Sequence, residues 1–248
     1  YQNVAGAGSI LGTDVVAKAA PDGYTLLMYH IGQATSASLY RKLPYDPLND
    51  FAPIGRVTDV PMTIIGRSTL EPGSATDLIG LIREKKDELT LANAGPGSSS
   101  HLCGMLLMSA LGVPMTTVPY KGTAPAMTDL LGGQIDLMIT DTSTGVPQIR
   151  SGKLRALGVS TAKRLAMLPE VPTISEAGVK GYDMGYWFAA YVPAGTPAPV
   201  VQRLNELLAQ ALKTPAAKAF FDTSGGEPFP TTPEALARFQ QDESRKWG

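Results

Sequence analysis

Short apolar runs alternate with segments of helical periodicity along the chain. A run of four to eight apolar residues between turn residues predicts a buried strand, whereas apolar residues three or four apart predict a helix with one buried face. The runs predicted as strands are residues 24–29, 61–66, 89–92, 116–120, 135–140, 154–160 and 187–192. Strands that alternate with helices along a chain predict an α/β fold.

Several helix beginnings can be identified because a hydroxyl residue precedes a proline or an acidic residue. Such helices are expected to begin at Ser74, Thr123, Thr196 and Thr232, and an earlier helix is expected at residues 13–20. The glycine pair at 132–133 predicts the end of the helix that Thr123 opens. Helices therefore follow most of the predicted strands.

Residues 59–68 and 187–193 have the character of strands that cross between two lobes. A chain that leaves one lobe, builds a second and then returns suits a cleft that opens and shuts. We predict one lobe from residues 1–65 and 188–248 and a second lobe from residues 66–187.

Composition excludes several classes of partner. Hydrophobic residues make up 44% of the 248 positions, which is enough for a buried core. Lysine and arginine number 21 against 22 aspartate and glutamate, a formal net charge of −1. This balance provides no basic surface for nucleic acid or an anionic membrane. No apolar run approaches the roughly 18 residues of a membrane span.

A glycine-rich turn at 94–97 leads into the serines Ser98, Ser99 and Ser100 and then into a helix. The first N–H groups of a helix and the positive end of its dipole form a site for an anion. A carboxylate fits this loop better than a polyphosphate, because no lysine or arginine lies in it and the phosphate-loop pattern is absent. The alternative is an ordinary turn in which the serines only cap the helix.

Two further loops have similar chemistry. Gly122 and Thr123 begin a helix after the next strand, with Lys121 beside them as either a source of charge or a solvated side chain. Helices that follow neighbouring parallel strands begin at the same edge of the sheet, where ligands of open α/β sheets bind. The hydroxyl-rich segment 140–145 follows the strand after that, and Asp141 is expected to orient it by capping.

The case for an enzyme is thin. Cys103 is the only cysteine, and His101, two positions away, would point in a different direction on a helix. Gly97-Ser98-Ser99-Ser100-His101 lacks the closing glycine of a Gly-x-Ser-x-Gly elbow. No metal-ligand spacing of His, Cys or paired carboxylates stands out. We predict neither catalytic nor metal-binding residues, and a hydrolase is the alternative.

Taken in order, the motifs of this chain resemble the Bug-type solute receptors of tripartite tricarboxylate transporters. The resemblance rests on residues 6–8 with Gly12, 17–27, 43–47, 50–53, 97–98 with 101–102, 118–122, 129–136, 152–157, 168–173 and 193–197. It covers nearly all of the chain. It implies a type II periplasmic binding protein, a Venus-flytrap fold of two α/β lobes.

The resemblance also implies a function. Such a receptor is periplasmic, needs no cofactor, and binds a small organic carboxylate that it hands to the membrane permease subunits of the transporter. We expect a monomer with no nucleic-acid partner. The family's loop contacts correspond to Asn93, Gly97, Ser98, Ser99, Gly122, Thr123 and Thr140, and also to His30 and Gly32.

Two departures from the family pattern are expected to matter. The family's first strand and its proline- and glycine-rich loop would precede Tyr1, and a final element would follow Gly248. We therefore expect a chain truncated at both ends, without a signal peptide. An alternative of the same two-lobed form is the ligand-sensing domain of a transcription regulator or signalling system. An upstream winged helix in the full gene would favour that alternative.

The second departure is Thr140, where much of the family is expected to have an aspartate. A carboxylate there could pair with the ammonium group of an amino acid, whereas burying an ammonium without a counter-charge costs several kcal/mol. Asp141 points to the opposite face of its strand. We therefore expect a ligand without an amino group, such as a dicarboxylate or an aromatic acid. Tyr186, Trp187 and Phe188 could form an apolar wall for it, or could serve hinge and core packing.

Overall fold

The computed structural model describes residues 2, 4, 9–71 and 75–247, and they form two compact units. Unit 1 comprises the described residues up to Asp59, Tyr186–Asp222, and those from Gly226 onward. Unit 2 comprises Val60–Gly185 and Thr223–Gly225. The expected helix beginning at Ser74 lies outside the described residues.

The unit boundaries differ from the lobe boundaries expected at 65/66 and 187/188. Strand β2, Phe51–Arg67, continues without interruption from one unit into the other. Its residues from Met62 onward already pair with strands of unit 2, which moves the boundary to 59/60. The return boundary lies at 185/186, because Trp187 packs on Phe239 of unit 1. A single strand can serve two units, so residue type along the strand does not mark the boundary.

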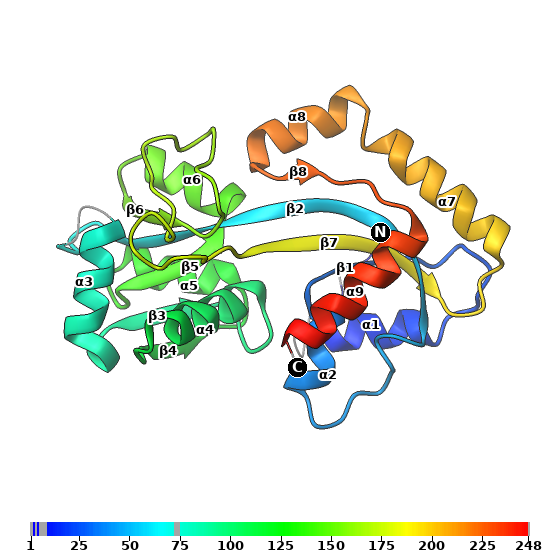
Figure 1. Ribbon diagram of the computed structural model, residues 1–248, viewed down its shortest axis with the longest axis horizontal. Helices are drawn as coiled ribbons and strands as arrows, with labels where there is room; N and C mark the ends of the chain where they lie inside the picture. The colour runs from blue at the N-terminus through cyan, green and yellow to red at the C-terminus, as the bar shows by residue number, and fades with distance from the viewer. Residues whose placement is uncertain (1, 3, 5–8, 72–74, 248) are drawn as a thin grey trace. The chain divides into compact units, whose positions relative to one another are not determined.

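Unit 1 combines a small sheet with helices from both ends of the chain (Figure 1). Its elements are α1 (Ile10–Ala17), β1 (Leu27–His30), α2 (Gly32–Leu39), the first part of β2, most of β7 (Gly185–Pro193), α7 (Ala198–Ala211), most of α8 (Pro215–Ser224), β8 (Glu227–Pro228) and α9 (Pro233–Trp247). The strand order is β1-β7-β2, and β8 also pairs with β2. Strands β1 and β7 are antiparallel, as are β2 and β8.

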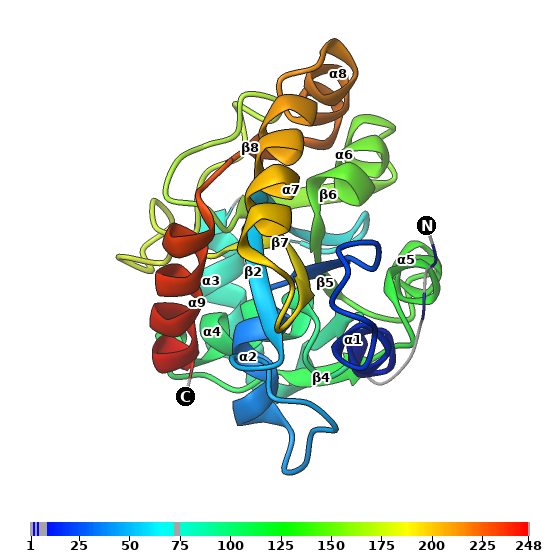
Figure 2. The ribbon, with the colours of Figure 1, turned by 90° about the vertical axis from the view of Figure 1, so that its right-hand side faces the viewer.

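Apolar side chains of α7 cover part of this sheet, and Figure 2 shows α7 in front of β2 and β7. Val201 of the helix packs with Ile54, Ala190 and Val192 of the strands. Figure 1 shows α9 beside α2, which is its neighbour in space although the two helices come from opposite ends of the chain. The hydroxyl of Ser244 donates to the carbonyl oxygen of Ala34 at 2.9 Å across this contact.

Unit 2 is an open α/β sheet with helices between its strands. Its elements are the second part of β2, α3 (Ala75–Lys85), the 3₁₀ turn η2 (Lys86–Glu88), β3 (Thr90–Asn93), α4 (Ser99–Leu111), β4 (Thr116–Pro119), α5 (Thr123–Leu131), β5 (Leu137–Asp141), α6 (Thr142–Arg150) and β6 (Leu154–Val159). The strand order is β6-β2-β5-β3-β4. Strand β3 is parallel to β4 and β5, whereas β2 is antiparallel to β5 and β6.

Most of the expected elements are present, with shifted ends. The helix expected at 13–20 spans Ile10–Ala17, and the strand expected at 61–66 is the end of a longer strand. Thr232 caps α9 by accepting from the N–H of Ala235 at 3.2 Å. Thr196 does not cap α7: the N-cap residue is Pro197, no side chain caps the helix, and the Thr196 hydroxyl donates to the carbonyl oxygen of Pro193 at 2.7 Å. None of the helices in the described ranges has both the length and the apolar character of a membrane span.

Candidate functional site

The carboxyl ends of β3, β4 and β5 lie at one edge of the unit 2 sheet, because these strands are parallel. Each strand is followed by a helix, so α4, α5 and α6 begin at that edge. Ligands of open α/β sheets bind outside the carboxyl ends of such strands. The candidates Asn93, Gly97, Ser98, Ser99, Gly122, Thr123 and Thr140 lie along this edge, which we call the β3–β5 edge.

The turn between β3 and α4 is shaped by the side chain of Asn93 and by the absence of a side chain at Gly95. The side-chain oxygen of Asn93, which is 3% exposed, accepts from the N–H of Gly95 at 3.0 Å. Gly95 has a φ of 110°, and a Cβ there would lie 2.9 Å from the carbonyl oxygen of Tyr120. Asn93 therefore shapes the turn, and a side chain at residue 95 would be strained by both conformation and contact.

Ser98 caps α4, and Ser100 holds the turn that precedes the helix. Ser98 Oγ accepts from the N–H of His101 at 3.2 Å, and Ser100 Oγ accepts from the N–H of Ala94 at 2.9 Å. The two hydroxyl oxygens lie 3.1 Å apart. The N–H of Gly97 donates to Nδ1 of His101 at 3.3 Å. These bonds favour the capping alternative for Ser98, whereas the hydroxyl of the half-buried Ser99 makes no hydrogen bond within the described chain.

The start of α5 differs from that of α4. Its N-cap residue is Gly122, with a φ of 116°, and no side chain caps the helix. Thr123 is half-buried, and within the described ranges its hydroxyl has no hydrogen-bond partner. Lys121 is exposed beside it. The first amides of α5 are therefore available to an anion, with a hydroxyl and an ammonium group nearby.

Helix α6 begins with a capping carboxylate, as expected from the sequence. Asp141 Oδ1 accepts from the N–H of Thr144 at 2.9 Å, and Oδ2 lies 3.2 Å from the hydroxyl of Thr144. The hydroxyl of Ser143 also donates to Oδ1. With three donors around it, the carboxylate of Asp141 is occupied in shaping its own helix end.

Thr140 is buried, with 2% of its surface exposed. Its carbonyl oxygen accepts from the hydroxyl of Thr63 at 3.2 Å. Its Cγ2 would lie 3.2 Å from a Cβ at Gly145, so the side chain packs under α6. Among the described residues, its own Oγ1 has no hydrogen-bond partner. A buried hydroxyl without a partner is costly, and a ligand or water at this end of β5 would satisfy it.

His30 and Gly32 belong to unit 1. Nδ1 of His30 accepts from the N–H of Gly32 at 2.9 Å, so the proton of the neutral ring is on Nε2. Burial lowers the pKa of His30 to about 4. The ring lies 4.6 Å from that of Tyr29 and 6.1 Å from that of Phe188, and it helps to line a hollow with Thr13 and Phe188.

The expected aromatic wall is corrected by strand alternation. Trp187 is 2% exposed and packs edge-to-face on Phe239 at 5.3 Å, so it belongs to the core. Tyr186 and Phe188 point to the other face of β7 and are half-buried, with ring centroids 5.3 Å apart. Successive strand residues face opposite sides, so the three aromatics cannot form one wall.

Cys103, the one cysteine that could act as a nucleophile, is unsuited to that role. Cys103 is buried, and burial raises the pKa of its thiol to about 12. Its sulfur lies 3.1 Å from the hydroxyl of Tyr182, which donates to the Cys103 carbonyl oxygen at 3.0 Å. Cys103 is therefore a packed thiol, not a nucleophile. Across the described ranges, no group of three or more His, Cys, Asp or Glu side chains could hold a metal ion.

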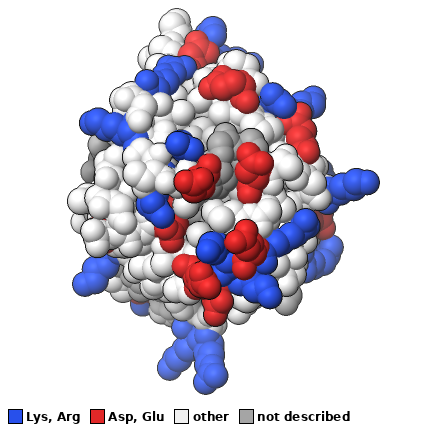
Figure 3. Space-filling view, turned by 90° about the vertical axis from the view of Figure 1, so that its left-hand side faces the viewer, with Lys and Arg blue, Asp and Glu red and all other residues white. Residues whose placement is uncertain are grey.

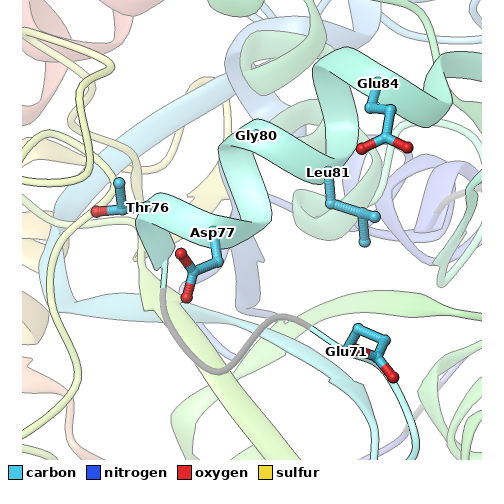
Figure 4. Close-up of a pocket in the computed structure, with 6 residues that line it drawn as sticks. All are labelled: Glu71, Thr76, Asp77, Gly80, Leu81 and Glu84. Atoms are coloured by element: carbon cyan, nitrogen blue, oxygen red, sulfur yellow. The ribbon is translucent and has the colours of Figure 1, made fainter.

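A second hollow, on α3, is unsuited to an anion. Figure 4 shows its lining, in which Glu71, Asp77 and Glu84 supply three carboxylates beside Thr76, Gly80 and Leu81. Like charges would repel a carboxylate ligand. On the face shown in Figure 3, basic and acidic side chains are interspersed, so no single-sign patch steers an anion there. Within unit 2, the β3–β5 edge is the better candidate.

Comparison with known proteins identifies the family. All of residues 1–248 match the family described as "Tripartite tricarboxylate transporter family receptor". The chain belongs to this family. Its members include the periplasmic binding protein BugD, whose solved structure is 44% identical with a TM-score of 0.92, covering 99% of this chain and 83% of that one.

Two solved structures from Rhodopseudomonas palustris carry a ligand in their descriptions. Rpa4515 with adipate is 35% identical with a TM-score of 0.93, covering 99% of this chain and 83% of that one. MatC with bound malate is 35% identical with a TM-score of 0.90, covering 99% of this chain and 85% of that one. The Bug-type resemblance and the two-lobed binding-protein fold are thereby confirmed, and the chain is a solute-binding receptor of this family.

Proposed function

We propose that this receptor binds a small carboxylate without an ammonium group at the β3–β5 edge, and that it delivers the ligand in the periplasm to the permease of a tripartite tricarboxylate transporter. The observation that carries the proposal is the uncapped start of α5 among capped neighbours. Ser98 and Asp141 use their side chains to cap α4 and α6, whereas Gly122 leaves the amides of α5 available. A carboxylate would supply the missing acceptor.

The charges near this edge favour an acid over an amino acid. The exposed Lys121 lies beside the start of α5, and the hydroxyl of Thr123 is available as a donor. The carboxylate of Asp141 already has three donors. Thr140 offers only a neutral hydroxyl. An ammonium group buried here would lack a counter-charge, which costs several kcal/mol.

The ligands named for related receptors agree with this proposal. Adipate and malate, named in the descriptions of the two R. palustris structures, are dicarboxylates without an ammonium group. The candidates His30 and Gly32, on unit 1, stay predictions. The candidates on unit 2 are also predictions, and Thr123 with the Gly122 amide region has the strongest geometric support.

Calorimetry on the purified chain tests the proposal. Adipate, malate, phthalate and benzoate are compared with aspartate and glutamate under one buffer condition. We expect at least one of the acids without an amino group to bind at least tenfold more tightly than either amino acid, a difference of about 1.4 kcal/mol. Tighter binding of aspartate or glutamate would overturn the ligand class. Delivery is tested by reconstituting uptake with the receptor and its permease, and uptake independent of the receptor would overturn that part.

A further inference from the structure

The strand ends at which the chain leaves and re-enters unit 1 lie in one sheet of that unit. The chain leaves unit 1 after Asp59 on β2 and again after Asp222 on α8, and it returns at Tyr186 on β7 and at Gly226 just before β8. Strands β2 and β8 pair at these ends, with Thr58 opposite Pro228 and Asp59 opposite Glu227. Strand β7 is the other neighbour of β2 in the sheet.

Arg56 lies at the centre of these contacts. It is 8% exposed, and its guanidinium carbon lies 4.2 Å from the ring centre of Phe229 and 4.1 Å from that of Phe239. The guanidinium also pairs with the carboxylate of Asp59, the last residue of β2 in unit 1. A planar cation between two rings is a favourable arrangement that a lysine ammonium does not reproduce. Arg56 thereby connects β2, the residue after β8, and α9.

Helix α9 extends these contacts to β7. Phe239, Glu243 and Trp247 are spaced four apart and therefore share one face of the helix. Phe239 packs on Trp187, the second residue of β7 in unit 1, with ring centres 5.3 Å apart. Glu243 Oε2 accepts from Nε1 of Trp187 at 3.3 Å and from Nε1 of Trp247 at 3.2 Å. One carboxylate oxygen therefore bonds both indoles.

We propose that Arg56 and Glu243 are positioning residues that clamp the ends of β2, β7 and β8 to α9 and so set the cost of movement between the two units. This inference rests on the proposed function, because such a movement affects binding only in a receptor that closes on its ligand. Neither residue belongs to the candidate ligand site. A looser clamp leaves more disorder to be lost on closure, so ligand affinity falls.

The clamp also provides its own optical signal. The chain contains 2 tryptophans, and both indoles bond Glu243. Tryptophan emission therefore reports on the surroundings of Glu243, and neither indole is a candidate ligand contact. Ligand binding is expected to change this emission, because the connection through β7 begins beside Trp187.

Substitutions in the full chain test the clamp. Arg56→Lys keeps the charge but loses the stacked plane, and Glu243→Gln weakens the acceptor for both indoles. Glu206→Gln is the matched control, since Glu206 is an exposed helical residue whose side chain pairs only with Arg203 in the described part of the chain. Adipate and malate affinities are measured by calorimetry, with tryptophan emission and urea unfolding recorded alongside.

We expect Arg56→Lys and Glu243→Gln to weaken both ligands by the same factor, about fivefold or more, while the control changes neither. The wild-type emission should shift on binding, and Glu243→Gln should reduce the shift. Wild-type affinities and an unchanged emission response in folded clamp variants would overturn the clamp. A loss of stability with unchanged affinity would also overturn it. A wild-type chain that binds no carboxylate contradicts the proposed function instead. In that case Glu243→Gln must still alter the ligand-free emission, and an unaltered emission would overturn the clamp as well.

Discussion

The two hydroxyls Ser98 and Thr123 are expected to respond in opposite ways to removal. Ser98 Oγ caps α4 by accepting from His101 N–H, so its hydroxyl serves folding. Thr123 stands at the start of an uncapped helix, and its hydroxyl has no partner in the described part of the chain. Thr123→Ala should therefore weaken ligand binding with little effect on stability, whereas Ser98→Ala should do the reverse.

The magnitudes follow from these contacts. Loss of one hydrogen bond to a charged carboxylate costs on the order of 1–3 kcal/mol, and a value of about 1.4 kcal/mol raises Kd about tenfold. We place Thr123→Ala near that tenfold value, with a change in unfolding free energy below about 0.5 kcal/mol. Loss of the Ser98 cap costs about 1 kcal/mol of unfolding free energy. In a chain of this size that corresponds to about 2–4 °C in Tm.

The assay combines calorimetry with urea unfolding monitored by circular dichroism. Thr128→Ala is the matched control, because it makes the same chemical change on the exposed face of the same helix, where the hydroxyl donates to the Ala124 carbonyl oxygen at 3.1 Å. The ligand is whichever acid binds most tightly in the carboxylate comparison. The control Thr128→Ala should bind the ligand with the wild-type affinity and should unfold at the wild-type midpoint.

Two results would contradict this assignment of the anion site. If Thr123→Ala binds the ligand with the wild-type Kd, the uncapped start of α5 is not the anion site. If Ser98→Ala instead loses about tenfold in affinity while its unfolding midpoint stays unchanged, the α4 turn is the site and its cap is dispensable.

Three further measurements test other parts of the structure. Ligand affinity should fall less than about threefold between 50 and 500 mM salt, because amide dipoles and one exposed lysine, Lys121, face the ligand; a steep decline would indicate a basic site. His30 has a pKa of about 4 in the folded chain against an ordinary 6.5. As the pH falls from 6.5 toward 4, the unfolded chain therefore protonates this imidazole before the folded chain does, and the free energy of unfolding decreases. Between pH 7.5 and 5.5 His30→Gln should lose about 1.3 kcal/mol less than the wild type in urea unfolding, and parallel pH profiles would contradict the burial of His30. Gly95→Ala should destabilise by about 1–3 kcal/mol more than Gly112→Ala, whose position has a positive φ but open space, and equal midpoints would contradict the close approach to Tyr120.

The fold could be predicted wherever local pattern and tertiary environment agree. The strands β3, β4, β5 and β6 lie within one or two residues of the predicted runs, because an apolar run between turn residues has few alternatives to a buried strand. Helix α5 begins at Thr123 and ends before the glycine pair, as expected, although no side chain caps it and its N-cap residue is Gly122. Patterns of this kind are local, so they can be recognised without knowing what packs around them.

Helices α2 and α6 could not be predicted in this way. Helix α2 consists largely of small and polar residues, and buried Gln33, Thr35 and Ser36 give it no amphipathic pattern. The side-chain amide of Gln33 donates to the carbonyl oxygen of Pro47 at 3.0 Å, a partner distant in sequence. Helix α6 contains Pro147 and several hydroxyl residues, yet it forms because Asp141 caps it and Val146 is buried. Tertiary contacts override weak local propensity in both helices.

The sequence by itself determined which loops form the candidate site, because glycine, hydroxyl and capping residues concentrate where parallel strands end. Only the tertiary structure decided how those residues are used. Ser98 and Asp141 are occupied as caps, Gly122 leaves α5 uncapped, and Trp187 is turned into the core while Phe188 is not. The physical reason is that a donor or acceptor is available to a ligand only if no neighbour already satisfies it, and those neighbours are brought together by the folded chain.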